Sequence, residues 1–271
     1  MDISIAIITW NSKGLLTQLL DSIRSDADDL GKEIIVVDNH SEDGTIEEIE
    51  KNYPEVLLIK NPTNEGVTKA RNALLENANG KYILYLDVDT RVLPGAVSAL
   101  VKAMDEHPDA VIGGPKLLYE DLSLQLSCRP FPSPLNILIE GTILSKYFPN
   151  SKYVTEYSMC RWDHAELREV DWMYGAALII RRNEMDEIGL FDEGYFYLYE
   201  DIDYCYRARR LGKKVIYIPQ AEIIHFFERE SRNPLNRTLS VHIQSILRYL
   251  RKDYTDLLWR RFSGKWEECH R

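Results

Sequence analysis

The feature that most constrains the fold is a regular alternation of strand-like and helix-like segments in the first half of the chain. Apolar runs rich in β-branched residues lie at residues 3–9, 33–37, 56–59, 81–86 and 110–113. The segments between them repeat apolar residues at helical spacing, at residues 15–23, 45–52, 66–78 and 94–104. This alternation predicts a parallel sheet with helices on both faces. At 271 residues the chain can form one large α/β domain, or one domain with a lobe.

Polar side chains follow three of these strand-like runs, where the ligands of parallel sheets bind. They are Thr9-Trp10-Asn11, Asp38-Asn39 and Asp87-Val88-Asp89. Alternation along a strand predicts that Asp87 and Asp89 lie on one side of the backbone, where like charges repel unless a cation lies between them. Mg²⁺ carrying a diphosphate suits this pair, because the ion prefers one or two carboxylates plus phosphate oxygens. A strand-end turn, where Asp is common, is the alternative.

Charge and cysteine content narrow the class of protein. The net charge of −10 argues against a general nucleic-acid-binding protein. Four cysteines without CxxC spacing predict neither a zinc site nor a disulfide framework, so a reducing cytosol is the expected compartment. The N-terminus enters a strand without a basic segment, and no later apolar run is long enough to span a bilayer. We therefore expect a cytoplasmic protein.

The regular pattern weakens between residues 129 and 168. Three prolines are expected to break regular elements there: Pro130, Pro132 and Pro134. We predict an irregular insertion that covers the site. A strand is predicted again at residues 170–180, a helix from Asn183 and a further helix across residues 238–251.

Six polar motifs stand in a fixed order along the chain. They are Thr9-Trp10-Asn11, Val37-Asp38-Asn39-x-Ser41-x-Asp43-Gly44-Thr45, Asn64-x-Gly66 with Asn72, Leu86-Asp87-x-Asp89-Thr90, Gly175-Ala176-Ala177 and Phe196-x-x-x-Glu200-Asp201-x-Asp203. Over about residues 3 to 250 they resemble the family 2 glycosyltransferases, and above all the bacterial rhamnosyltransferase-type members. The resemblance implies the GT-A fold, a Rossmann-like α/β architecture with a central, mostly parallel sheet and an acceptor-side C-terminal half.

The resemblance implies a donor site in the first half of the chain. Thr9, Asn11 and Asp38 would hold the base and ribose of a dTDP- or UDP-linked sugar, and Asp87 would contact the ribose. An alternative for the motif around Asp38 is helix capping, for which Ser41 with Gly44-Thr45 would suffice.

The same resemblance implies a metal site beside the donor. Asp89 would bind Mg²⁺ or Mn²⁺ on the diphosphate, and His225 would be a further metal or diphosphate ligand, although a structural role is the commoner use of a lone His. Asn64 and Arg71 would border the same cleft. Arg71 could reach phosphate, and a solvated helix position is its alternative.

The second half would bind the acceptor. Attack by a sugar hydroxyl needs a base, and the resemblance assigns that role to Asp201, with inversion at the anomeric carbon. The alternative is that Glu200, Asp201 and Asp203 are acidic residues of a first helical turn, favoured there by the helix dipole. The residues expected to shape the acceptor pocket are Trp172, Gly175, Ala176 and Glu200.

The function predicted from this resemblance is transfer of a sugar, with rhamnose as a candidate, to a saccharide or lipid-linked saccharide in cell-surface polysaccharide synthesis. A sugar-nucleotide pyrophosphorylase is disfavoured, because Trp10-Asn11-Ser12-Lys13 replaces the Gly-rich turn with Arg that such enzymes need. A processive synthase would need membrane helices and a Gln-x-x-Arg-Trp motif after Glu200-Asp201. It is disfavoured as well, because Arg161-Trp162 precedes that pair and Ser158 replaces the Gln. The remaining alternative is an inactive carbohydrate-binding or scaffolding relative.

We expect a nucleotide-sugar-binding half at residues 1–115, an acceptor-binding and catalytic half of the same domain at residues 116–235, and a helical basic tail at residues 236–271. The tail interleaves cations with aromatic residues: Arg248, Tyr249, Arg251, Lys252, Trp259, Arg260, Arg261, Phe262, Lys265 and Trp266. This pattern suits peripheral contact with an anionic membrane on its inner face. A C-terminal helix docked on the domain is the alternative.

Overall fold

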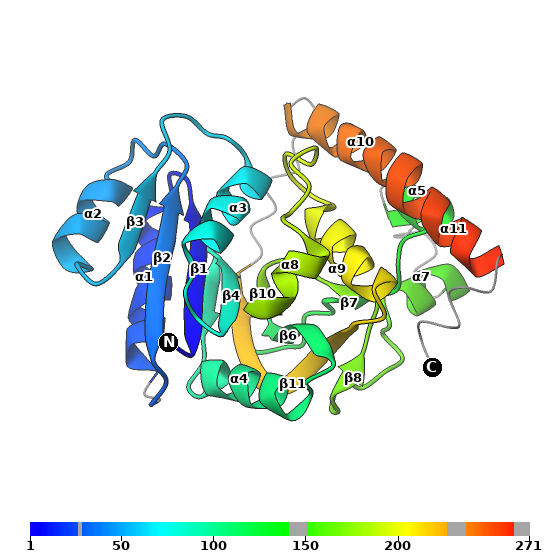
Figure 1. Cartoon of the computed structure of the whole chain (residues 1–271), viewed down its shortest axis with the longest axis horizontal. Helices are drawn as coiled ribbons and strands as arrows, with labels where there is room; N and C mark the ends of the chain where they lie inside the picture. The colour runs from blue at the N-terminus through cyan, green and yellow to red at the C-terminus, as the bar shows by residue number, and fades with distance from the viewer. Residues whose placement is uncertain (27–28, 141–150, 227–236, 263–271) are drawn as a thin grey trace.

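A mixed β-sheet forms the centre of the molecule (Figure 1). The computed structural model describes residues 1–26, 29–140, 151–226 and 237–262. Within these residues the sheet follows the order β3-β2-β1-β4-β10-β6-β11-β5, with β8 paired to β11, and β7 and β9 form a separate pair. The strands are β1 (Ile3–Thr9), β2 (Lys32–Asp38), β3 (Leu57–Lys60), β4 (Tyr82–Asp87), β5 (Thr90–Val92), β6 (Ala110–Leu118), β7 (Cys128–Arg129), β8 (Arg168–Glu169), β9 (Trp172–Met173), β10 (Ala177–Arg181) and β11 (Lys214–His225).

The long strands of the sheet share one direction, which confirms the prediction of a mostly parallel sheet. β1, β2, β3, β4, β6 and β11 run together, whereas β5, β8 and β10 run against them. β10 lies between β4 and β6, so that a strand from the second half of the chain occupies the middle of the sheet. The carboxyl end of β4 therefore meets segments that follow it by about 90 residues in sequence.

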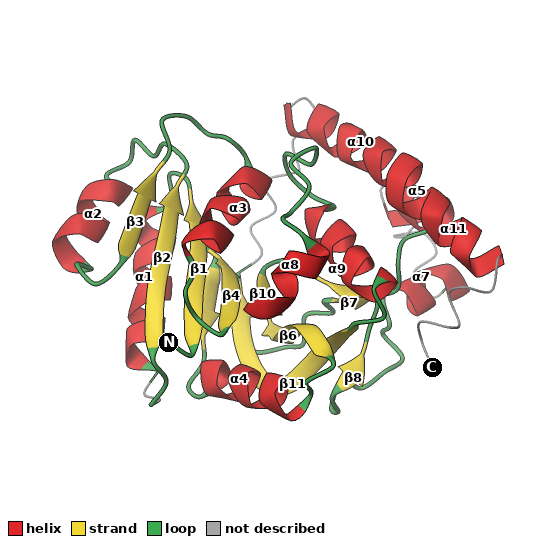
Figure 2. Ribbon diagram, in the orientation of Figure 1, coloured by secondary structure: helices red, strands yellow, loops and turns green. Residues whose placement is uncertain are grey.

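Helices cover both faces of the sheet, as predicted (Figure 2). Alternation along β1 explains why: Ile5 belongs to the core on one face, which includes buried residues of α1 and α4, and Ala6 belongs to the core on the other, which includes buried residues of α3 and α9. The helical segments are α1 (Lys13–Ser25), α2 (Thr45–Asn52), α3 (Val67–Asn77), α4 (Ala96–Glu106), α5 (Pro134–Glu140), α7 (Lys152–Tyr157), a 3₁₀ turn (Arg182–Glu184), α8 (Met185–Ile188), α9 (Glu200–Arg210), α10 (Arg237–Tyr249), a π-helical turn (Leu250–Tyr254) and α11 (Thr255–Phe262).

Two predictions for the second half are wrong in detail. Pro134 does not break a helix but begins α5, because the first position of a helix needs no N–H donor. The insertion is therefore partly regular, with α5 and α7 inside it, while residues 141–150 lie outside the described residues. The single strand predicted at residues 170–180 is two strands, β9 and β10, separated by a turn at residues 174–176.

The C-terminal helical segment is docked on the domain, which is the alternative that the sequence left open. Arg248 forms ion pairs with Asp192, and Lys252 reaches both Asp192 and the fully buried Asp203. The buried Tyr249 donates a hydrogen bond to the carbonyl of Pro132 at 2.8 Å. Lys265 and Trp266 lie outside the described residues. Among the residues described, no helix has the length and apolar character needed to cross a bilayer.

Candidate active site

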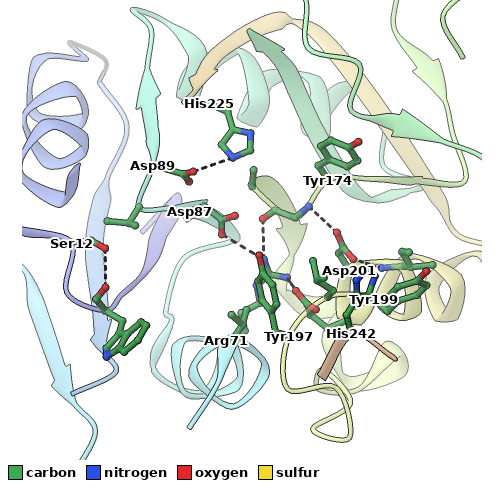
Figure 3. Close-up of a pocket in the computed structure, with 18 of the residues that line it drawn as sticks. Ser12, Arg71, Asp87, Asp89, Tyr174, Tyr197, Tyr199, Asp201, His225 and His242 are labelled. Carbon is green, nitrogen blue, oxygen red and sulfur yellow. Dashed lines mark hydrogen bonds and ion pairs between the residues drawn. The ribbon is translucent and has the colours of Figure 1, made fainter. Parts of the chain in front are cut away.

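A cavity of about 1100 Å³ lies beyond the carboxyl ends of β1 and β4 (Figure 3). Segments far apart in sequence form its wall, because β10 and β11 place the second half of the chain beside β4. The structure brings ten of the predicted site residues into this wall: Asn11, Arg71, Asp87, Asp89, Trp172, Gly175, Ala176, Glu200, Asp201 and His225. The lining also includes Trp10, Ser12 and Lys13, which the sequence did not single out as ligands.

Asp87, Asp89 and His225 form a cluster on one side of the cavity (Figure 3). Each offers a ligand atom within 4.8 Å of the others, and Nε2 of His225 lies 3.4 Å from Oδ2 of Asp89. The register of β5 against β11 pairs Thr90 with His225, so that the strand pairing itself holds the imidazole next to Asp89. Two carboxylates and one imidazole are a donor set that suits Mg²⁺ or Mn²⁺.

Gln125 contacts His225 at this cluster, and the sequence did not predict a role for it. Its side chain is 2% exposed, and its Oε1 lies 2.7 Å from Nδ1 of His225. In this arrangement Nδ1–H of His225 donates to the Gln125 carbonyl oxygen, and Nε2 is the nitrogen that faces Asp89. Buried partners of this kind fix the orientation and tautomer of metal-ligating imidazoles. The sequence carries no signal for this contact, because the two residues are 100 positions apart.

Asp87 stands between the cluster and a buried arginine. Burial raises the pKa of the Asp87 carboxyl to about 6, with the neighbouring charge of Asp89 adding to the shift and the cation of Arg71 opposing it. Nη2 of Arg71 lies 3.7 Å from Oδ1 of Asp87. Arg71 is only 3% exposed, so the alternative of a solvated helix position is wrong.

Asp201 lies on the other side of the cavity, in the first turn of α9. Its Oδ2 accepts a hydrogen bond from the Gly175 N–H at 3.0 Å, and its Oδ1 accepts one from the Ile202 N–H at 2.8 Å. Burial raises the pKa of Asp201, while Arg71 and these N–H donors oppose the rise. Leu198 and Tyr199, which precede the pair Glu200-Asp201, have φ angles of 65° and 72°. Non-glycine residues with such angles mark strained backbone, which occurs at functional sites.

Three predicted donor residues do not line the cavity. Thr9 and Asp38 are almost fully buried, and among the described residues Oγ1 of Thr9 and Oδ1 of Asp38 have no hydrogen-bond partner. Asn64 accepts a hydrogen bond from the Gly66 N–H at 3.0 Å. The capping alternative for Ser41 is wrong: Ser41 Oγ accepts from the Asn11 N–H, and Asp43 instead accepts from the Thr45 N–H at the start of α2.

The sequence is similar to that of known glycosyltransferases. Residues 4–130 match the family described as Glycosyl transferase family 2. The N-acetylglucosaminyl-diphospho-decaprenol L-rhamnosyltransferase of Mycobacterium tuberculosis is 29% identical over 248 residues, which cover 86% of this chain and 78% of that protein. Rhamnosyltransferase WbbL of Escherichia coli is 33% identical over 81 residues, or 30% of this chain and 31% of that protein.

Solved structures share the fold at low sequence identity. GalNAc-T7, solved with UDP, GalNAc and Mn²⁺, superposes with a TM-score of 0.66 and 18% identity, covering 91% of this chain and 47% of that chain. The mannosyltransferase PcManGT of Pyrobaculum calidifontis, in complex with GDP-Man and Mn²⁺, gives a TM-score of 0.59 and 18% identity, covering 92% of this chain and 64% of that chain. The family match over residues 4–130, the curated relatives and the fold agree: the chain is a glycosyltransferase with the GT-A fold, and residues 4–130 are the part that matches family 2.

Proposed function

We propose that the protein is an inverting, metal-dependent glycosyltransferase that moves a sugar from a nucleoside-diphosphate donor to a saccharide acceptor. The observation that carries this proposal is that one cavity is lined by the cluster of Asp87, Asp89 and His225 on one side and by the carboxylate of Asp201 on the other. A donor diphosphate at the cluster would place its sugar toward Asp201. Inversion then needs only one attack, by an acceptor hydroxyl that gives its proton to a base on the far side of the sugar.

Asp89 and His225 would hold Mg²⁺ or Mn²⁺, with Asp87 beside them toward the ribose. When bound there, the ion would supply positive charge that stabilises the diphosphate as it leaves. The arrangement fits such an ion because Gln125 orients the imidazole of His225 so that Nε2 faces Asp89. Relatives in fold that were solved with Mn²⁺ support this choice of ion.

Replacing Gln125 with Ala tests the orientation of His225. We expect Mn²⁺ to bind about 10-fold more weakly, because partners behind a metal-ligating imidazole typically contribute 10–100-fold in affinity. Titration calorimetry with Mn²⁺ measures the effect, with Gln18→Ala on the outer part of α1 as the matched control, since Gln18 does not line the cavity. Unchanged Mn²⁺ affinity in Gln125→Ala would show that the contact with His225 does not serve metal binding.

Asp201 would be the base. The N–H groups of Gly175 and Ile202 hold its carboxylate toward the cavity. Glu200 would accept a hydrogen bond from a second acceptor hydroxyl, since its Oε2 is buried without a hydrogen-bond partner among the described residues. Trp172, Gly175 and Ala176 would complete the acceptor pocket in the cavity wall.

The base and ribose would lie near Asn11, Thr9 and Asp38, with Asn64 at the edge of the same region. Thr9 and Asp38 do not line the cavity, so the base would reach them only after side chains move. Their unpaired oxygens support this placement, because an unpaired buried oxygen is costly and a thymine or uracil N–H or a ribose hydroxyl would then pair it. The pyrimidine N–H suits a dTDP- or UDP-linked donor. We propose that residues 1–115 bind this donor and residues 116–235 bind the acceptor.

Similarity to known proteins favours rhamnose as the donor sugar and a lipid-linked saccharide as the acceptor. The relative from Mycobacterium tuberculosis is named for transfer of L-rhamnose to N-acetylglucosaminyl-diphospho-decaprenol. We propose the cytoplasmic face of the membrane as the location and cell-surface polysaccharide synthesis as the process. The free thiols of the buried Cys128 and Cys205 agree with a reducing compartment.

Membrane contact would use the outer face of α10 rather than all of the basic tail. Arg248 and Lys252 already pair with carboxylates of the domain, whereas Ile243 and Leu247 are 48% and 45% exposed. Apolar residues on an outward helix face favour the interface of a bilayer. We expect the protein to float with anionic liposomes at low salt and Ile243→Ser/Leu247→Ser to float less. A protein that stays in solution with these liposomes contradicts membrane contact.

Binding of the donor tests the proposed function directly. The protein is titrated with dTDP-rhamnose and with UDP- and GDP-linked sugars, each with and without Mn²⁺, while the melting temperature is recorded. A ligand in large excess over its Kd should raise the melting temperature through mass action. We expect the largest rise for a dTDP- or UDP-linked sugar in the presence of Mn²⁺. No rise with any nucleotide sugar would refute the proposal.

A further inference from the structure

Arg71 is a buried cation between the two sides of the cavity. It lies on α3 with 3% of its surface exposed, and its guanidinium packs over the rings of Tyr85 and Phe191 at 5.7 and 5.5 Å. The hydroxyl of Tyr85 donates to the Arg71 carbonyl at 3.1 Å, which fixes the backbone as well. Charged side chains are almost never buried in this way unless they are paired.

The two hydrogen bonds of the Arg71 guanidinium go to the acceptor side of the site, and a longer ion pair joins it to Asp87 (Figure 3). Nη1 donates to Oε1 of Glu200 at 3.0 Å, and Nη2 donates to the carbonyl oxygen of Gly175 at 3.0 Å. Asp87, the carboxylate on the donor side, is more distant, at 3.7 Å from Nη2. Each terminal nitrogen thus donates one of its two N–H groups to a protein acceptor, which ties the guanidinium to Glu200 and to the Gly175 turn.

The contact with Gly175 leads directly to Asp201. Gly175 accepts a hydrogen bond from Arg71 through its carbonyl oxygen, and its own N–H donates to Oδ2 of Asp201. A Cβ atom at position 175 would lie 2.7 Å from Nη2 of Arg71, so the close approach requires glycine. The next residue, Ala176, accepts a hydrogen bond from the Asp87 N–H at 2.9 Å. The turn is therefore held from the donor side and the acceptor side at once.

We propose that Arg71 is a positioning residue, which holds Glu200 and the Gly175 turn so that the carboxylate of Asp201 faces the donor sugar. This inference rests on the proposed function, in which Asp201 is the base. It replaces the expectation that Arg71 contacts the donor diphosphate. Misplacement of a reacting group by about 1 Å can lower the rate 10²-fold. We expect a loss of kcat of this size when Arg71 no longer holds Asp201 in place.

The charge of Arg71 also acts on the carboxylate that it positions. The titratable groups that interact electrostatically with Asp201 include Arg71 from α3, Glu200 and the Cys205 thiol from α9, and Asp87 from β4. Burial raises the pKa of Asp201 and Arg71 opposes it. Loss of the cation should raise this pKa further, and the acidic limb of the rate profile should move to higher pH.

Three variants separate the effect of position from the effect of charge. Arg71→Lys keeps the charge but loses the two-pronged contact, and Gly175→Ala keeps Arg71 but displaces its guanidinium. For both we expect kcat to fall by about 10²-fold, with donor affinity unchanged by calorimetry and an unshifted acidic limb. Arg71→Met should lower kcat and also shift the acidic limb to higher pH. Because Arg71→Met leaves Glu200 buried without its cation, Arg71→Met/Glu200→Gln removes both charges and is the variant to use if the single one fails to fold.

Donor affinity and kcat together provide the results that would overturn this inference. A loss of donor affinity of about tenfold or more in Arg71→Lys, with kcat retained, would make Arg71 a ligand of the diphosphate and overturn the positioning role. Wild-type kcat in both Arg71→Lys and Gly175→Ala would overturn it as well. Asp201→Asn is measured beside them: if that variant is fully active, the assignment of the base has failed, whereas an inactive Asp201→Asn with an active Arg71→Lys refutes only the role of Arg71.

Discussion

Asp89→Ala is expected to abolish measurable transfer, with a loss on the order of 10³-fold or more, because groups that stabilise a developing charge contribute 10²–10³-fold each. Asp89 lies in the cluster with Asp87 and His225, and its removal takes away a charged metal ligand. Donor binding should weaken in the same variant, since the diphosphate loses its counterion. The measurements are the rate of sugar transfer and the donor Kd by calorimetry, both with Mn²⁺ present.

Asp121→Ala is the matched control for Asp89→Ala, because Asp121 is an exposed carboxylate outside the cavity. It should retain wild-type transfer and donor affinity. Chelation of the metal provides an independent check on the wild-type protein. Full transfer in excess EDTA would contradict the metal role of Asp89, whatever the variant does.

Asp201→Asn should lower transfer by about 10²–10⁴-fold, the usual contribution of general-base catalysis, because the amide keeps the shape of the side chain but cannot accept the proton. Donor affinity should survive, since Asp87, Asp89 and His225 are untouched. The wild-type rate should fall as the pH drops through the raised pKa of Asp201, because only the ionised carboxylate acts as a base. Transfer is measured at saturating donor and acceptor across the pH range.

Glu200→Gln is the companion to Asp201→Asn on the neighbouring residue. It should cost less, because Glu200 contacts Arg71 and at most an acceptor hydroxyl. If Glu200→Gln is inactive while Asp201→Asn transfers sugar at the wild-type rate, the base is Glu200.

The first half of the fold was predictable because its determinants are local. The predicted strand at residues 3–9 and helix at residues 45–52 have the bounds that the structure gives to β1 and α2. Both show the apolar periodicity and flanking turn residues that mark strands and helices. Asp87 and Asp89 were likewise predictable, since a strand followed by two spaced carboxylates is visible in a few consecutive residues.

Residues whose roles depend on distant partners were not predictable in the same way. Arg71 sits on a helix where a charged residue is expected in solvent, and only Glu200 and Gly175, more than 100 positions later, account for its burial. Gln125 lies in a loop without periodicity, and its importance follows from the position of His225 at the end of β11. Pro134 was misjudged although the signal is local: Ser133 precedes it and accepts a hydrogen bond from the Asn136 N–H at 3.2 Å, and a proline after such a capping residue favours the start of a helix.

The most direct test of the account is a transfer reaction with a defined acceptor. The protein, dTDP-rhamnose and a short-chain N-acetylglucosaminyl-diphospho-polyprenol are incubated with Mn²⁺, and the product is identified by mass spectrometry and by the anomeric configuration of the new linkage in NMR. UDP-sugars are run in parallel, and Asp201→Asn is the negative control. The account predicts a gain of one sugar residue with inverted configuration, which disappears in EDTA and in Asp201→Asn. A product with retained configuration, or one that forms equally well in EDTA, would contradict it.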